Sequence, residues 1–138
     1  LREGTHPVVL ASAGIGCTPM VAMLHHLVEQ GGDRKVLVLH ADRDPHTHAH
    51  REEVRELVEA LPDATLRTWY ENGAPEDGRS GRGLMDLGGV EIPEGAEAYL
   101  CGPLPFMRGV RAQLLQAGVP ARLVHYEVFG PDLWLATV

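Results

Sequence analysis

Three stretches of the chain are apolar without interruption, and this feature most restricts the fold. They read VVLA at residues 8–11, VLVL at 36–39 and YLC at 99–101. A strand with one face in water carries a polar residue at every second position, whereas a strand that is apolar throughout is covered on both faces. Such strands are typical of parallel sheets, because the crossover helices of a parallel sheet cover both of its faces.

Segments with helical periodicity alternate with these runs. Strands are expected at about residues 6–11, 35–41, 65–70, 98–101 and 122–129, and helices at about 18–30, 45–61 and 105–117. Asp44 followed by Pro45 is typical of a helix N-cap and first helical position. A polar loop with four glycines, ENGAPEDGRSGRG, occupies 71–83. The alternation predicts an α/β fold: a doubly wound, Rossmann-like, parallel five-stranded sheet in the strand order 3-2-1-4-5, with helices on both faces.

Composition limits the functions open to the chain. Its 138 residues suit one domain over 1–138, and no apolar run approaches the roughly 18 residues of a membrane span. A net charge of −7 argues against an electrostatic nucleic-acid binder. Two cysteines are too few for a disulfide framework or a structural zinc site. We therefore expect a cytoplasmic protein without membrane or nucleic-acid partners, and the polar start without Met indicates a part of a longer protein.

The first apolar run leads into a glycine-rich turn that reads LASAGIGCTPM at 10–20. Glycines at this place let the backbone approach a diphosphate, and the amides of the following helix then face the anion. The alternative is a turn that uses glycine only for its conformational freedom. The spacing departs from G-x-G-x-x-G, because proline stands where the third glycine would be. The candidate cofactor-binding residues of this turn are Ala13, Gly14, Gly16, Thr18 and Pro19.

A second turn of the same design follows the fourth predicted strand, in YLCGPLPFM at 99–107. In the order 3-2-1-4-5 the first and fourth strands are neighbours, so both turns flank one crevice at the carboxyl ends of the strands. Cys101 is expected at the floor of that crevice. Two alternatives remain for this cysteine: a buried small hydrophobic side chain and a disulfide with Cys17.

Several motifs carry a resemblance to a known family. SAGIGCTPM, LCGPLPFM and the closing HYEVFGP resemble the nucleotide-binding module of the ferredoxin–NADP reductase superfamily, from about residue 6 to the end of the chain. LHADRD, HREEVRELVEALP, RTWYENG and GRGLMDL are most similar to flavohemoglobins. The sequence departs from the flavohemoglobin pattern at Cys17, usually Gln or an aliphatic residue, and at Val128, frequently a cysteine.

The resemblance implies roles for the motif residues. The first turn matches the family's pyrophosphate loop, and Gly102, Pro103 and Met107 match its second motif. Cys101 matches the cysteine that helps place the nicotinamide ring for hydride transfer. Glu127 matches an acidic position near the flavin, and Phe129 matches an aromatic residue beside the flavin ring. The resemblance also implies upstream FAD and globin domains as partners, with FAD and heme as further cofactors.

The end of the second strand, LHADRDP, concerns the choice between NADH and NADPH. An acidic side chain there binds the ribose hydroxyls of NAD, whereas an arginine accommodates a 2′-phosphate. Asp42 and Arg43 are both present, so the residues leave the choice open, and the resemblance to flavohemoglobins favours NADH. His40 precedes them as either a ligand contact or a buried packing residue.

The eight histidines raise the question of a metal. His46 and His50 stand four residues apart, which suits zinc on a helix, but no further ligand follows at the spacing of a zinc enzyme. A solvated helix start is the favoured interpretation, and no metal is predicted. His125 is expected to be structural.

The leading hypothesis is the NAD(P)H-binding domain of a flavoprotein reductase. In a flavohemoglobin it passes hydride to FAD, and the electrons continue to heme for conversion of nitric oxide to nitrate. Two alternatives stay open. One is a reductase that supplies an iron–sulfur centre or an oxygenase, and the other is a nucleotide-sensing module without catalysis. Cys101, Glu127 and Phe129 argue against the sensor, since pure binding needs none of them.

Overall fold

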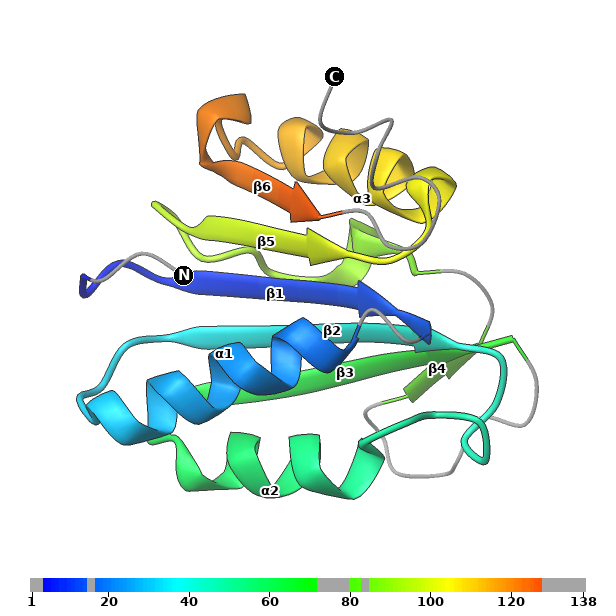
Figure 1. Cartoon of the computed structure of the whole chain (residues 1–138). Helices are drawn as coiled ribbons and strands as arrows, with labels where there is room; N and C mark the ends of the chain where they lie inside the picture. Colours follow the sequence, from blue (N-terminus) through cyan, green and yellow to red (C-terminus); the bar gives the residue numbers. More distant parts are fainter. Residues whose placement is uncertain (1–3, 15–16, 72–79, 83–84, 128–138) are drawn as a thin grey trace.

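The described residues of this computed structural model are 4–14, 17–71, 80–82 and 85–127, with the backbone alone at 17, 80–82 and 127. They form one parallel sheet of six strands in the order β4-β3-β2-β1-β5-β6 (Figure 1). The strands are β1 Val8–Ala13, β2 Val36–Asp42, β3 Ala64–Tyr70, β4 Ser80–Arg82, β5 Glu97–Cys101 and β6 Val124–Glu127. The helices are α1 Cys17–Gln30, α2 Arg51–Ala60 and α3 Leu104–Gln116, with short 3-10 helices η2 Leu87–Gly89 and η3 Ala121–Leu123.

Both faces of the sheet are covered, as the uninterrupted apolar runs predict. Val8 and Leu10 of β1 pack with residues of α1 and α2 in one cluster. Val9 and Ala11, which point the other way, pack with residues of α3 and η2 in a second cluster. Successive side chains of a strand alternate between faces, so each apolar run supplies both cores. Figure 1 shows α1 and α2 together on one side of the sheet.

The predicted five-strand order is confirmed, and a short sixth strand extends it. The five predicted strands correspond to β3, β2, β1, β5 and β6 in that spatial order. The additional strand, β4, pairs with the end of β3 at the sheet edge. It has three residues and lies inside the glycine-rich stretch predicted as loop. Because a segment this short shows no hydrophobic period, the sequence pattern did not indicate it.

The predicted start of α2 is wrong by six residues, because the helix begins at Arg51 rather than Pro45. The Asp44 carboxylate accepts hydrogen bonds from the backbone N–H groups of His46 at 2.8 Å and Thr47 at 3.0 Å. These bonds stabilise a separate turn before the helix, since aspartate favours such local turns. His50, at the N-cap of α2, has a left-handed backbone with φ 58°. The segment 43–50 therefore forms a loop beside the end of β2.

None of the helices in the described ranges is long and apolar enough to cross a membrane.

Candidate functional site

The two glycine turns meet at the carboxyl edge of the sheet. In the parallel register of β1 and β5, Ser12 lies opposite Cys101, so the turn after each strand begins at the same level. A Cβ on Gly102 would lie 3.3 Å from the backbone nitrogen of Ala13 and 3.0 Å from Cδ2 of Phe106. Only glycine allows this close approach, and its φ of +155° is one that other residues rarely adopt.

A pocket of about 390 Å³ opens where these strands end. Its walls come from the ends of β1 and β2, from the residues that follow β3 and β5, and from the 43–50 loop. Parallel sheets bind ligands at this edge, next to the point where the strand order reverses. The lining residues are Ala13, Gly14, Ala41, Asp42, Arg43, Thr47, Ala49, Glu71 and Pro103.

The beginning of α1 suits an anion. Gly14 has a φ of +57°, and the space where its Cβ would stand is open. No acidic residue occupies the first turn of α1, so the free N–H groups and the positive end of the helix dipole are not neutralised by a carboxylate there. Thr18 is exposed and Pro19 is half-buried within this first turn. Gly16 lies outside the described residues.

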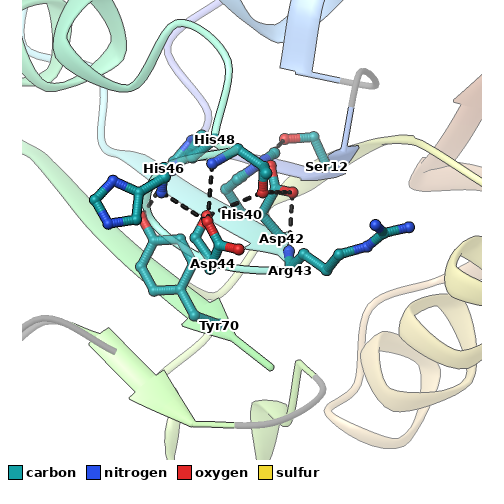
Figure 2. A network of polar contacts seen from close by, with 9 residues as sticks. Ser12, His40, Asp42, Arg43, Asp44, His46, His48 and Tyr70 are labelled. Atoms are coloured by element: carbon teal, nitrogen blue, oxygen red, sulfur yellow. Dashed lines mark hydrogen bonds and ion pairs between the residues drawn. The ribbon is translucent and has the colours of Figure 1, made fainter. Parts of the chain in front are cut away.

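A chain of buried polar side chains lies directly beneath the pocket (Figure 2). The Ser12 hydroxyl is 2.7 Å from Nδ1 of His40, and Nε2 of His40 is 3.1 Å from Oδ2 of Asp42. Ser12 and His40 are each 2% exposed. His40 therefore does not line the pocket, and it reaches the pocket only through Asp42.

The Asp42 carboxylate is held at both oxygens. Oδ1 accepts the backbone N–H of Arg43 at 2.9 Å and the Thr47 hydroxyl at 3.4 Å. Burial raises the pKa of this carboxyl, but the hydrogen bonds from His40 and the Arg43 backbone outweigh burial and leave the pKa below its ordinary value. The pocket therefore has an ionised carboxylate in its wall at neutral pH.

His48 connects the hydrogen-bonded side chains of Ser12, His40 and Asp42 to β3. Its ring stacks on the His40 ring with 4.0 Å between centroids and 16° between planes, and its Nδ1 is 2.7 Å from the Tyr70 hydroxyl. Nε2 of His48 is buried without a hydrogen-bond partner among the described residues. Burial, followed by the charge of His40, lowers the pKa of His48 to about 4, so the ring is neutral at physiological pH.

Cys101 lies on the other side of the β5 turn. It is 1% exposed and borders a smaller pocket of about 170 Å³ between the start of α1 and the ends of β5 and β6. Other residues that line this pocket are Pro19, Met20, Met23, Tyr99, Leu100, His125 and Tyr126. Cys101 pairs with Glu127 in the register of β5 and β6. The side chains of Cys17 and Glu127, and the whole of Phe129, lie outside the described part of the chain.

Two sequence-predicted groups are not at the pocket. Met107 is 3% exposed and packs in the α3 core. His46 and His50 precede α2 and do not share a helix, so the spacing that suits zinc is not realised on one helical face. Within the described ranges, no group of three or more His, Cys, Asp or Glu residues is placed to hold a metal ion.

His125 pairs with Tyr99 of β5 and contacts Glu97, the first residue of that strand. Its Nε2 contacts one oxygen of the buried Glu97 carboxylate, and Nε2 of His6 contacts the other at 2.9 Å. The His125 ring also stacks on Tyr99. These contacts join β5, β6 and the segment before β1, which is the structural role expected for His125.

Several residues of the site, His48 and Tyr70 among them, were not found from the sequence. Ser12, Thr47 and Glu71 belong to the polar chain or the pocket wall. A polar residue directly after an apolar run was an available signal for Ser12 and Glu71. No local signal indicated Thr47, because its position depends on the turn that replaces the first residues of the predicted helix.

Comparisons with known proteins agree with this geometry. A family model described as the oxidoreductase NAD-binding domain matches residues 10–112. The chain belongs to this family. The matched range of the NAD-binding domain includes both glycine turns and the loop that forms the pocket wall.

Relatives of this NAD-binding domain confirm the predicted resemblance to flavohemoglobins. A flavohemoprotein of Rhizobium meliloti (strain 1021) is 41% identical over 140 residues, which cover 96% of this chain and 34% of that protein. The flavohem-like FAD/NAD-binding domain of nitric oxide dioxygenase from Vibrio cholerae O1 biovar El Tor is 38% identical, with a TM-score of 0.87, over 95% of this chain and 54% of that one.

A flavohemoglobin from Malassezia yamatoensis with bound FAD and heme is 32% identical, with a TM-score of 0.81. The match covers 94% of this chain and 33% of that one. The NAD-binding domain thus spans about a third of the length of the curated relatives that it matches.

The contact between the two turns predicts an unequal response to two glycine substitutions. Gly102→Ala is expected to lower the free energy of unfolding by about 1–3 kcal/mol more than Gly95→Ala, because the new methyl group meets the Ala13 backbone. Gly95 is the matched control, since its φ is +78° and its Cβ position is open. Urea denaturation measures both values. Equal losses would show that the turns are not in contact.

The neutral, buried His48 predicts a pH-dependent stability. Its pKa of about 4 lies below the ordinary 6.5, so between these values the unfolded chain binds more protons and the folded state loses stability as the pH falls. The loss is at most about 3 kcal/mol, complete near pH 4. Denaturation of wild type and His48→Phe from pH 7 to 4 should show a smaller pH effect in the variant. The exposed His26→Gln is the control, and parallel curves for wild type and His48→Phe would contradict the prediction.

Proposed function

We propose that the chain binds the adenosine diphosphate half of NADH in the 390 Å³ pocket and presents the nicotinamide to FAD held elsewhere in a longer, flavohemoglobin-type protein. The contact of Gly102 with Ala13 carries this proposal, because it joins the two turns into one anion-binding edge. The open space at Gly14 and the acid-free first turn of α1 fit a diphosphate at that edge.

The ribose end of the pocket supports NADH over NADPH. Asp42 lines the pocket, and its lowered pKa keeps the carboxylate charged. A charged carboxylate accepts hydrogen bonds from the ribose hydroxyls and repels a 2′-phosphate. Arg43 also lines this pocket, but its side chain is exposed to solvent, whereas Asp42 is partly buried in the wall. Glu71 adds a second carboxyl group to the wall.

The nicotinamide end is assigned to Cys101, Glu127 and Phe129. Cys101 and Glu127 stand opposite each other where β5 and β6 end. When bound, NADH supplies a hydride, that is, two electrons and one proton, to the flavin. The protein contributes orientation, because transfer requires the two rings to lie nearly parallel and in contact. Cys101, buried at the wall of the smaller pocket, would help to place the nicotinamide ring, and an acidic side chain at 127 would favour the positive charge of the oxidised ring.

The partners in this proposal are FAD and globin domains of the same longer protein. The chain spans only about a third of its flavohemoprotein relatives, and the flavohemoglobin of Malassezia yamatoensis holds FAD and heme. In such a protein FAD would supply the redox chemistry that takes electrons from NADH, and heme would supply the chemistry that converts nitric oxide and dioxygen to nitrate. The proposal also places the protein in the cytoplasm, where a thiol such as Cys101 stays reduced. It involves no nucleic acid and no membrane.

Calorimetry with ADP-ribose and its 2′-phosphorylated form tests the nucleotide assignment. The chain should bind ADP-ribose, and should bind its 2′-phosphorylated form more weakly, because the Asp42 carboxylate repels the added phosphate. Asp42→Asn should lower affinity for ADP-ribose by about tenfold, since a hydrogen bond to a charged group is lost. Absence of ADP-ribose binding at millimolar concentration would refute the proposal.

Stopped-flow reduction of the flavin in the longer protein tests the nicotinamide assignment. Cys101→Ala should slow flavin reduction more than it weakens NADH binding, because the cysteine orients the ring rather than anchors the dinucleotide. An unchanged reduction rate would contradict this role. Rapid reoxidation of the reduced protein by an iron–sulfur protein, but not by nitric oxide with dioxygen, would instead favour a reductase that supplies an oxygenase.

A further inference from the structure

The proposed function uses Asp42 but gives no role to Ser12 and His40, which hydrogen bonds join to it. A serine, a histidine and a carboxylate in line also occur in hydrolases. Ser12, however, lies inside β1 between β2 and β5 and is only 2% exposed. A substrate cannot reach its hydroxyl. A role for Ser12 and His40 in ligand binding must therefore act through Asp42, the residue of this hydrogen-bonded series that lines the pocket.

The order of donors and acceptors follows from the charge of Asp42. An ionised carboxylate only accepts hydrogen bonds, so Nε2 of His40 carries the hydrogen in its 3.1 Å contact with Oδ2. In a neutral imidazole the other nitrogen then accepts. The Ser12 hydroxyl therefore donates to Nδ1 at 2.7 Å. The Asp42 carboxylate thus selects the imidazole form with an N–H at Nε2, and the Ser12 hydroxyl complements that form by donating to Nδ1.

The position of the His40 ring is also determined from outside its own strand. His48 stacks on one face of the ring at 4.0 Å, and His48 is itself bonded to the hydroxyl of Tyr70 on β3. Ser12 belongs to β1. Three adjacent strands and the 43–50 loop thus hold one imidazole, as Figure 2 shows. A ring held in this way cannot turn its N–H away from the carboxylate.

The two oxygens of Asp42 are not used equally. Oδ1 accepts from the Arg43 backbone and from Thr47, whereas the described contacts of Oδ2 come from His40 alone. A carboxylate oxygen accepts about two hydrogen bonds. Oδ2 therefore keeps the capacity to accept one hydroxyl from a ligand in the pocket. The hydrogen bond from His40 determines the direction in which Oδ2 can accept that hydroxyl.

We propose that His40, held by Ser12 and His48, is a positioning residue that orients Asp42 to accept a hydrogen bond from a ribose hydroxyl. In this way His40 determines the preference for an unphosphorylated over a 2′-phosphorylated dinucleotide. This inference rests on the proposed function, because it needs the ribose to lie at Asp42. It adds that discrimination depends on residues that do not touch the ligand.

Calorimetry on substituted chains tests the role of His40. His40→Leu should lower affinity for ADP-ribose by about tenfold and change affinity for 2′-phospho-ADP-ribose much less. His40→Gln should restore most of the preference, because the glutamine amide places an N–H near the position of Nε2. In the Asp42→Asn background, His40→Leu should have no further effect on the preference, since both residues act through one carboxylate.

Leu114→Ala is the control for a general loss of stability. Leu114 belongs to α3 and is fully buried in the core on the other face of the sheet, so its truncation destabilises the fold without touching the polar chain. The preference for ADP-ribose should remain as in the wild type. If Leu114→Ala and His40→Leu reduce the preference equally, the effect of His40 is only structural and the inference is overturned.

Nitrogen-15 NMR of the imidazole rings provides a readout that stability does not affect. In the wild type, Nε2 of His40 should carry a hydrogen; a bare Nε2 would overturn the inference.

The binding results distinguish a failure of the proposed function from a failure of the inference about His40. If the wild type binds neither nucleotide, the proposed function fails and the inference with it. If the wild type prefers ADP-ribose and His40→Leu keeps that preference, only the inference fails. If the wild type binds ADP-ribose and 2′-phospho-ADP-ribose with equal affinity, the inference is overturned while nucleotide binding stands.

Discussion

The close approach of the β1 and β5 turns is the constraint on which the rest of the site depends. Parallel pairing places the end of β1 beside the end of β5, and Gly102 lets the second turn lie against the backbone of Ala13. A Cβ at 102 would press on the Ala13 backbone and on Phe106. Ala13 and Pro103, on the two sides of this contact, both line the pocket.

The two edges of the sheet are built for different tasks. At the amino-terminal edge, the Glu97 carboxylate is bound by His6 and His125, so its hydrogen-bonding capacity serves the fold. At the carboxyl edge, Asp42 is bound by His40 and the 43–50 loop but still faces a pocket. A buried polar network is costly unless its members are paired. At the carboxyl edge, the described pairing of Asp42 leaves one acceptor position toward the pocket.

Hydrophobic pattern alone was sufficient for most of the fold. Uninterrupted runs such as VVLA predicted a sheet covered on both faces, and the alternation with helices predicted a doubly wound α/β fold. The pattern failed for β4, which has only three residues, and at the start of α2. There Asp44 binds the amides of His46 and Thr47. A local turn and a helix N-cap use the same side chain, so the residue type does not distinguish them.

By itself, the sequence determined the α/β class, both glycine turns, the presence of Asp42 and Arg43 at one strand end, and the family resemblance. These properties are local, because each depends on a few neighbouring residues. The tertiary structure alone decided that Ser12 meets His40, 28 positions away, that His48 stacks on that ring, and that Thr47 and Glu71 share a pocket wall. Contacts of this kind depend on strand register and loop path, which arise only when the separate segments pack against one another.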